Sequence, residues 1–96
     1  MMPNKFKNVP IDEDTTILFQ KEKKLGKYHV LHERWNWDGV NAESIIFANE
    51  DITNIDDNVI KKEVKASELF KADSILNIKR TESGFTFVNF NADLEL

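Results

Sequence analysis

The chain of 96 residues contains no cysteine, so neither a disulfide bond nor a thiolate metal ligand is available to it. This absence fits a reducing compartment. No apolar run approaches the roughly 18 residues that a membrane-spanning helix requires, and residues 1–10 lack the apolar core of a secretory signal peptide. We therefore expect a soluble, cytoplasmic protein.

Glycine is also scarce, and its three occurrences at positions 26, 39 and 84 are isolated from one another. They form no glycine-rich phosphate loop, and no serine lies in the G-x-S-x-G context of a hydrolase nucleophile. The neighbouring carboxylates fall in expected loops or at an expected helix start, where turns and caps explain them. The sequence therefore predicts no catalytic residues and no cofactor. It favours a non-enzymatic protein without settling the question.

His29 and His32 are the only histidines, and they lie in a segment of β-forming residues. Residues three apart in a strand point to opposite faces, so the two imidazoles do not converge on one metal ion. The order H-V-L-H-E also differs from the zinc-protease pattern H-E-x-x-H. We expect no metal site. A partly buried His29 or Glu33 beside Trp35 and Trp37 is instead a candidate for a shifted pKa.

Charged residues are abundant and unevenly distributed. They make up 31% of the chain, while 41% is apolar, which suffices for the modest core of one domain. Seven Phe, two Trp and one Tyr make this core rich in aromatics. The net charge is −4, and residues 35–60 carry acidic charge alone: Asp38, Glu43, Glu50, Asp51, Asp56 and Asp57. Such a chain is a poor candidate for binding nucleic acid through its overall charge, although a local basic patch within residues 61–80 stays open.

The first half of the chain predicts three strands. Three segments are rich in β-branched and aromatic residues: residues 15–22, 28–37 and 43–49. Gly26 favours a turn between the first two strands. The pair Asp38-Gly39 favours a turn after the second, in a loop that extends to position 41 or 42. The three strands are expected to form an antiparallel meander.

The second half predicts a helix and a hairpin. Asp56 or Asp57 can cap a helix that runs to about residue 70. Residues 59–66 also suit an edge strand, and the sequence leaves the two alternatives open. Residues 74–90 contain two runs of β-forming residues around a polar break that ends in a glycine, which predicts a hairpin.

Together these elements predict an α+β fold of about five strands in a largely antiparallel sheet, with one helix packed on one face. Residues 15–96 are expected to be a single domain. Residues 1–14 are polar, contain both prolines and predict a flexible N-terminal arm. A single helix cannot cover five strands, so we expect the arm, sheet curvature or a second copy of the chain to cover the other face.

Residues 84–90, with the sequence GFTFVNF, resemble the aromatic strand signature of RNA-recognition-motif domains, K/R-G-F/Y-G/A-F-V-x-F/Y. Upstream, the segment IIFAN is loosely similar to the family's other aromatic strand, so the resemblance covers residues 45–90. The chain departs from the signature at Ser83, where the family has a basic residue, and at Thr86, where the family has a small residue. The resemblance implies that Phe85 and Phe87 stack on bases of single-stranded RNA, which makes nucleic-acid binding an alternative function.

A protein-interaction surface is the function that the sequence favours. Phe85 and Phe87 are expected to share a face with three residues of the neighbouring strand, Ile75, Asn77 and Lys79. This gives aromatic anchors with a polar and basic border. Such a surface suits a homodimer or a heterologous protein partner, for example a basic target that this acidic protein inhibits. We therefore expect a small, acidic interaction or regulatory module without catalytic activity.

A further alternative is a small-ligand-binding protein or an enzyme with an aromatic cleft. Leu31, Trp35 and Trp37 share one face of a strand, and a dimer could enclose a cleft lined by either tryptophan. The candidate binding residues from all these interpretations are Phe85, Phe87, Lys79, Ile75, Trp35 and Trp37. The sequence does not identify a partner, a ligand or an oligomeric state.

Overall fold

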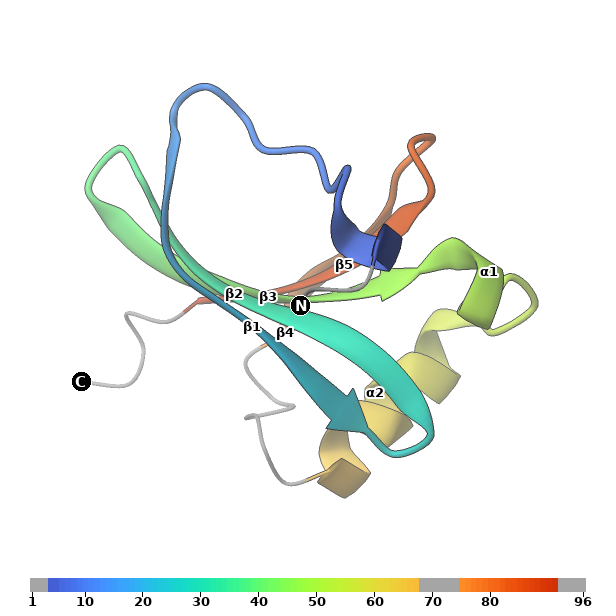
Figure 1. Cartoon of the computed structure of the whole chain (residues 1–96). Coiled ribbons are helices and arrows are strands. Elements are labelled where there is room, and N and C mark those ends of the chain that lie inside the picture. Colours follow the sequence, from blue (N-terminus) through green and yellow to red (C-terminus); the bar gives the residue numbers. More distant parts are fainter. Residues whose placement is uncertain (1–3, 68–74, 92–96) are drawn as a thin grey trace.

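The computed structural model describes residues 4–67 and 75–91 of the chain. Five strands form one sheet in the order β1-β2-β3-β5-β4, and each neighbouring pair is antiparallel (Figure 1). The elements in chain order are η1 (Asn4–Phe6), β1 (Thr15–Leu25), β2 (Tyr28–Trp37), β3 (Val40–Ala48), α1 (Asn49–Ile52), α2 (Asp57–Ser67), β4 (Ile75–Arg80) and β5 (Phe85–Asn91). The predicted α+β class and the five-stranded antiparallel sheet are confirmed.

The first three strands form a meander with tight connections. At the second turn, Asp38 and Gly39 have positive φ angles of 50° and 82°. Two positive φ angles are typical of a type I′ turn, whose twist matches that of the strands on either side. Trp37 therefore pairs directly with Val40, the first residue of β3. The predicted extension of this loop to position 41 or 42 is wrong, because the two-residue turn closes the hairpin by itself.

β5 lies between β3 and β4, so the two strands that the helices connect do not pair with each other. Both are antiparallel to β5 and hence parallel to each other. The β4–β5 hairpin closes where the backbone N–H of Thr81 donates to the carbonyl of Phe85 at 2.7 Å. The backbone N–H of Asn49 donates to the carbonyl of Gly84 at 2.9 Å, which ties the end of β3 to this turn.

Two helices connect β3 to β4, where the sequence predicts one. α1 is a short helix that precedes the predicted one, and it includes Asn49, the last residue of the predicted third strand. Residues 59–66 form part of α2, and the carboxylate of Asp56 accepts the N–H of Val59 at 3.0 Å in the manner of an N-cap. The expected helix end near residue 70 lies outside the described residues. In the described parts of the chain, neither helix is long and apolar enough to cross a membrane.

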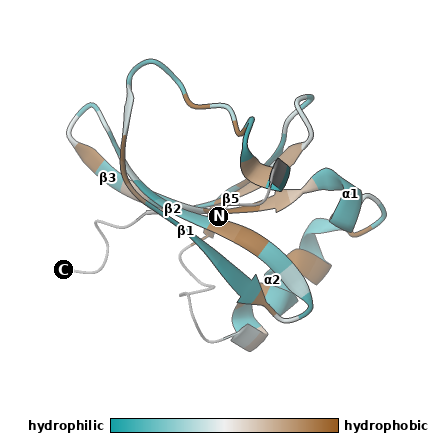
Figure 2. Cartoon of the chain, in the orientation of Figure 1, coloured by the Kyte–Doolittle hydropathy of each residue, from teal (hydrophilic) through white to brown (hydrophobic). Residues whose placement is uncertain are grey.

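The sheet carries a buried apolar cluster on each face. On the face that we call the helix face, Val30, Ile45 and Phe47 share a cluster with Ile60 and Val64 of α2. The other buried members of this cluster are Leu25, Tyr28, Ile52, Val88 and Phe90. Figure 2 shows hydrophobic positions both within the strands and on α2. Alternate residues of each strand point to the opposite face and build the second cluster.

The opposite face, which we call the arm face, is partly covered by the N-terminal segment (Figure 1). Phe6 is only 3% exposed and shares a cluster with Leu31, Ile46 and Phe85. Its ring meets the imidazole of His29 edge-on, with the ring centroids 5.7 Å apart. The N-terminal segment thus buries apolar surface on the side of the sheet away from α2.

Candidate ligand-binding site

A row of polar side chains crosses the arm face from one edge of the sheet to the other. Each strand contributes one residue, and the strand registers place each residue beside the next: Gln20, Glu33, Ser44, Asn89 and Asn77. Apolar residues lie on both sides of this row in the central strands, and Glu22 and Lys79 stand at the two ends of one neighbouring row. One neighbouring row contains Leu31, Ile46 and Phe87, and the other contains Ile17, Trp35 and Ala42. Polar groups in such surroundings need hydrogen-bond partners, from the protein or from a ligand.

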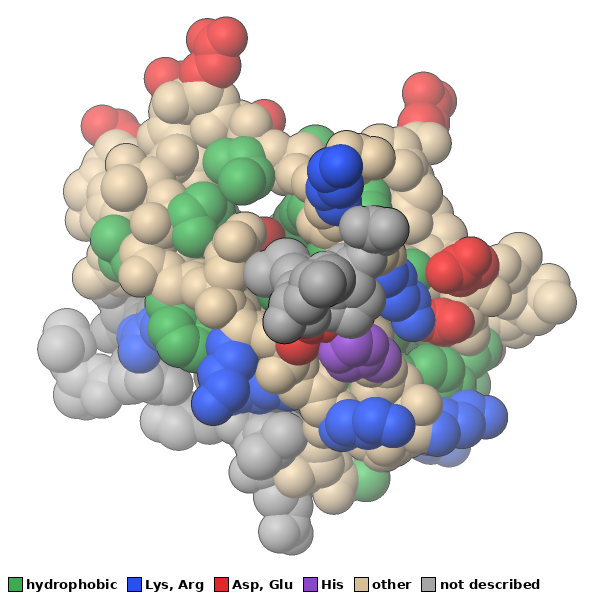
Figure 3. Space-filling model, viewed as in Figure 1, with side chains coloured by type: hydrophobic (Ala, Val, Ile, Leu, Met, Phe, Trp, Pro, Cys, Tyr) green, Lys and Arg blue, Asp and Glu red, His purple; other side chains and the backbone are tan. Residues whose placement is uncertain are grey.

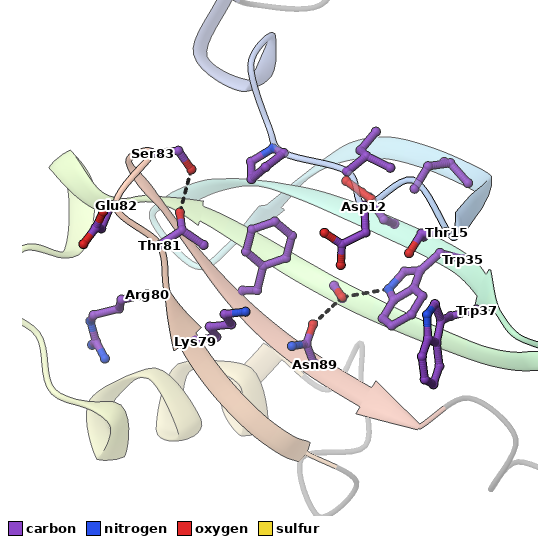
Figure 4. A pocket seen from close by; sticks show the side chains of 16 residues that line it. Asp12, Thr15, Trp35, Trp37, Lys79, Arg80, Thr81, Glu82, Ser83 and Asn89 are labelled. Atoms are coloured by element: carbon purple, nitrogen blue, oxygen red, sulfur yellow. Dashed lines mark hydrogen bonds between the residues drawn. The ribbon is translucent and has the colours of Figure 1, made fainter.

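Hydrogen bonds join part of the row into a directed chain. Trp35 Nε1 donates to Ser44 Oγ at 3.0 Å, and the Ser44 hydroxyl donates to Asn89 Oδ1 at 2.6 Å (Figure 4). Asn89 Nδ2 then donates to Asn77 Oδ1 at 2.8 Å. Because its N–H is bonded to Ser44, the indole of Trp35 is held in one orientation, and its ring is available for contact with a ligand.

A pocket of about 630 Å³ lies over this row. Its floor includes Glu33, Trp35 and Phe87, and its walls come from residues 10–12 of the N-terminal segment and residues 79–83 of the β4–β5 hairpin. Figure 3 shows the hollow beside the N-terminal segment, with hydrophobic side chains on its wall. The volume falls within the range of roughly 300–1,000 Å³ that small-molecule sites occupy.

Glu33 is the buried carboxylic acid of this pocket, with only 3% of the residue exposed. Burial raises the pKa of the Glu33 carboxyl, and a hydrogen bond from Gln20 Nε2 at 3.3 Å opposes this rise only in part. Among the described residues, no basic side chain forms an ion pair with it. The folded protein therefore holds the proton of this carboxyl to a higher pH than the unfolded chain does. Folding stability is lost as the pH rises from the unfolded-state pKa of this group through its folded-state pKa.

The other charged groups of the pocket lie on its rim. Asp12 reaches into the pocket from the N-terminal segment, whereas Lys79 lies on β4 at the far side (Figure 4). Arg80 also contributes to the lining, but its guanidinium binds the carboxylate of Asp57 and the carbonyl of Ile55. Asp12 and Glu33 lie toward the β1–β2 side of the pocket, whereas the third acid, Glu82, belongs to the β4–β5 hairpin. Lys79 is the basic lining residue without such a bond to Asp57.

Four of the six binding residues predicted from the sequence lie together in this pocket. Trp35, Trp37 and Phe87 supply aromatic surface, and Lys79 lies beside Phe87 in the strand register. Trp37 is 49% exposed at the rim, while Trp35 is half-buried in the floor. The sequence pattern that grouped the two tryptophans on one face of β2 therefore located residues of the pocket.

The other two predicted residues lie elsewhere. Phe85 is 6% exposed and is buried beside Phe6, so it forms part of the core and not of an open surface. Ile75 packs with the cluster of the helix face and does not share a face with Phe87. The reason is a register shift in β4 between Ile75 and Asn77, which turns Ile75 to the other side of the sheet.

The resemblance to RNA-recognition-motif domains does not extend to the arrangement of the aromatic side chains. Phe47, in the segment similar to the family's second aromatic strand, is buried in the cluster of the helix face. Phe85 and Phe87 belong to the arm face. The three rings therefore do not form one platform, and the expected stacking role of Phe85 is wrong because Phe6 packs against it.

The two histidines lie on opposite faces of β2. His29 lies 2.8 Å from Glu22, and His32 lies 3.0 Å from Glu43. Burial lowers the pKa of His32, against the raising effect of its hydrogen bond with Glu43. In the ranges that the structure describes, no group of three or more His, Asp or Glu side chains is placed to hold a metal ion.

Several residues of the pocket were not identified from the sequence. Ser44 and Asn89 interrupt otherwise apolar alternation in β3 and β5, which is the available signal for polar groups pointing into a face. Gln20 follows a register shift in β1, so the alternation of that strand does not predict its face. Asp12 reaches the pocket through the path of the N-terminal segment, and no local pattern predicts this path.

Comparisons of the chain with protein-family models, with curated proteins and with solved structures found no match. The class of the protein is therefore defined by its fold and by the residues of its pocket. It is a small α+β domain in which a polar row, two tryptophans and a buried carboxylic acid line an open pocket on an antiparallel sheet. Any functional conclusion therefore rests on this geometry.

Proposed function

We propose that this protein is a non-catalytic binding module that holds a small ligand in the pocket of the arm face. The observation that supports this most directly is the convergence of aromatic surface and hydrogen-bonding groups in one cavity. Ligand sites commonly combine a mainly apolar lining with a few placed polar groups that orient the ligand.

Binding is favoured over catalysis by the hydrogen bonds of the floor. Ser44 is the hydroxyl that lies directly across the strands from Glu33, but it donates its proton to Asn89 and accepts the N–H of Trp35. A nucleophilic serine would instead donate to a general base. The row therefore supports recognition of a ligand's polar groups, with the aromatic rings supplying most of the contact area.

We expect the Trp37→Ala substitution to weaken ligand binding without unfolding the protein. The indole of Trp37 is half exposed at the rim, so its removal costs little core packing. Loss of an aromatic anchor is expected to reduce affinity about tenfold, equivalent to about 1.4 kcal/mol. The measurement is a ligand-observed NMR screen with neutral, cationic and anionic aromatic fragments, followed by titration of the hits.

Leu76→Ala is the matched control, because Leu76 is 59% exposed on β4 and does not line the pocket. The proposal is supported if the hits bind the parent and the control with equal affinity and bind Trp37→Ala with lower affinity. Hits that bind all three proteins alike, or a screen without hits, would contradict it.

A second candidate function is association with another copy of the chain, and a patch of exposed apolar side chains favours it. β1 is an edge strand, and the first half of it carries Leu18 and Phe19, which are 58% and 39% exposed. Leu18 and Phe19 form this patch; Ile11, Trp37 and Val40 are exposed as well, but Ile11 and Trp37 line the pocket of the arm face. Unpaired edge strands with apolar side chains favour association, whereas the lysines in the second half of β1 oppose it.

This candidate predicts that the parent protein is a dimer and that Leu18→Lys converts it to a folded monomer. A charge placed in the patch would have to be buried on association. Leu76→Lys is the control, because Leu76 is equally exposed and also lies at a register shift, but on the opposite edge strand. Light scattering over a concentration series decides the question. A monomeric parent, or equal behaviour of the two variants, would argue against a dimer through β1.

A further inference from the structure

Glu33 lacks a counter-charge in the described structure, although it is almost fully buried in the pocket floor. Its one hydrogen bond, from Gln20 to Oε1, is long at 3.3 Å. An ionised carboxylate has two oxygens and can accept about four hydrogen bonds. A ligand that donates hydrogen bonds and carries positive charge would therefore supply what the protein itself does not.

Both tryptophans of the chain lie on the same strand and the same face as this acid. Trp35 and Trp37 follow Glu33 at intervals of two residues, and all three line the pocket. Indole is the side chain whose face attracts cations most strongly. The hydrogen bond from Trp35 to Ser44 fixes one indole, and Asp12 adds a second carboxylate from the N-terminal segment (Figure 4).

The basic groups of the pocket do not neutralise this side of it. Arg80 is bonded to Asp57 and to the carbonyl of Ile55. Lys79 lies on β4, and both β3 and β5 separate that strand from β2, which carries Glu33. An anionic ligand group near β2 would meet two carboxylates, whereas a neutral ligand would leave Glu33 unpaired. The side of the pocket at β2 therefore favours a cation.

We infer that the ligand is an organic ammonium compound, an amine or quaternary ammonium joined to an apolar group, whose cation lies between Glu33 and the two indole rings. This inference rests on the proposed function, because it assigns a ligand class to the same pocket. The aromatic and aliphatic lining then contacts the apolar part of the ligand, and Asn89 and Ser44 remain beside it in the floor.

A bound cation favours the ionised form of Glu33, whereas burial in the free protein favours the neutral form. Affinity is therefore expected to rise as the pH increases through the pKa of Glu33. At pH values between the pKa of Glu33 in the complex and its higher pKa in the free protein, binding should release a proton from the carboxyl group. The other titratable side chains that line the pocket are Asp12, Lys79, Arg80 and Glu82. Glu22 lies on the arm face next to Gln20, paired with His29.

The experiment compares 2-phenylethylamine with 2-phenylethanol, which has nearly the same shape but carries no charge. Tryptophan fluorescence reports binding directly, since the chain has two tryptophans and both line the pocket. At about pH 8 we expect the amine to bind about tenfold more tightly than the alcohol. We expect this preference to diminish at about pH 5, where a carboxyl with a raised pKa is increasingly protonated.

Glu33→Gln is the test variant, because an amide has nearly the same size and cannot carry the charge. It is expected to bind the amine about tenfold less tightly and to bind the alcohol as the parent does. Glu22→Gln is the matched control on the same face, outside the pocket lining. Thermal melting at neutral pH should show that Glu33→Gln is at least as stable as the parent, since a neutral amide removes the cost of burying a charge.

The outcomes separate the inference from the function on which it rests. If the amine and the alcohol bind equally and Trp37→Ala weakens both, the ligand-binding function stands and the inference of a cation is wrong. If Glu33→Gln and Glu22→Gln lose the same amount of affinity for the amine, the loss comes from the change in overall surface charge, and the inference is overturned. The inference would also be overturned if the amine changed the tryptophan fluorescence neither at about pH 8 nor at about pH 5.

Discussion

Replacing Phe47 with alanine is expected to lower the free energy of unfolding by about 3–5 kcal/mol, the range for removing a buried phenylalanine. Phe47 is 1% exposed in β3 and belongs to the cluster that joins the sheet to α2. Its ring also meets that of Tyr28 edge-on, with centroids 5.7 Å apart. A domain of this size has a total stability of only about 5–15 kcal/mol, so the variant should be close to unfolding.

Urea denaturation followed by circular dichroism measures this loss. Phe19→Ala is the control, because Phe19 lies on the edge strand β1 and is 39% exposed. We expect this control to lose less than about 1 kcal/mol, since half-exposed side chains contribute little packing. If Phe47→Ala and Phe19→Ala were equally stable, the cluster of the helix face could not be the main core of the protein.

The second large effect is expected from Phe6→Ala, which should lower the free energy of unfolding by about 3 kcal/mol. Phe6 lies outside the sheet, but it is as buried as a core residue and covers Leu31, Ile46 and Phe85. We place the expected loss at the low end of the range for phenylalanine because a segment outside the sheet can adjust to fill part of the cavity.

The same substitution is expected to weaken ligand binding, because residues 10–12 form a wall of the pocket and follow the segment that Phe6 anchors. Lys7→Ala is the control, since Lys7 belongs to the same segment and is exposed. Urea denaturation and amine titration of the two variants test both effects. The role assigned to Phe6 is wrong if the two variants match in stability, or if Phe6→Ala loses stability and retains full affinity.

Local patterns predicted the secondary structure well. The alternation of β2 placed Trp35 and Trp37 on one face, and the pair Asp38-Gly39 marked the following turn. The bounds of β2 agree with the predicted segment, and the hairpin predicted over residues 74–90 is formed by β4 and β5, which end at Asn91. These features follow from residue type and a period of two, which depend on neighbours in the sequence alone.

Two register shifts limited the prediction of side-chain directions. They lie in the edge strands, at Leu18 in β1 and at Leu76 in β4. Each shift inserts one residue into the strand, so the residues before it point to the face opposite to the one that simple alternation predicts. Ile75 therefore lies on the helix face, contrary to the prediction. Such a shift depends on how a strand pairs with its neighbour, and the alternation of a single strand does not reveal it.

The sequence by itself determined the class of fold, the approximate strands and three aromatic residues of the pocket, Trp35, Trp37 and Phe87, because local chemistry specifies these features. Tertiary structure decided that β5 lies between β3 and β4, that Phe6 buries Phe85, and that Glu33 joins a polar row of residues from five strands. The physical reason is that contacts between distant segments depend on the total apolar surface that they bury and on the hydrogen bonds that they satisfy, and neither quantity is a property of a local segment.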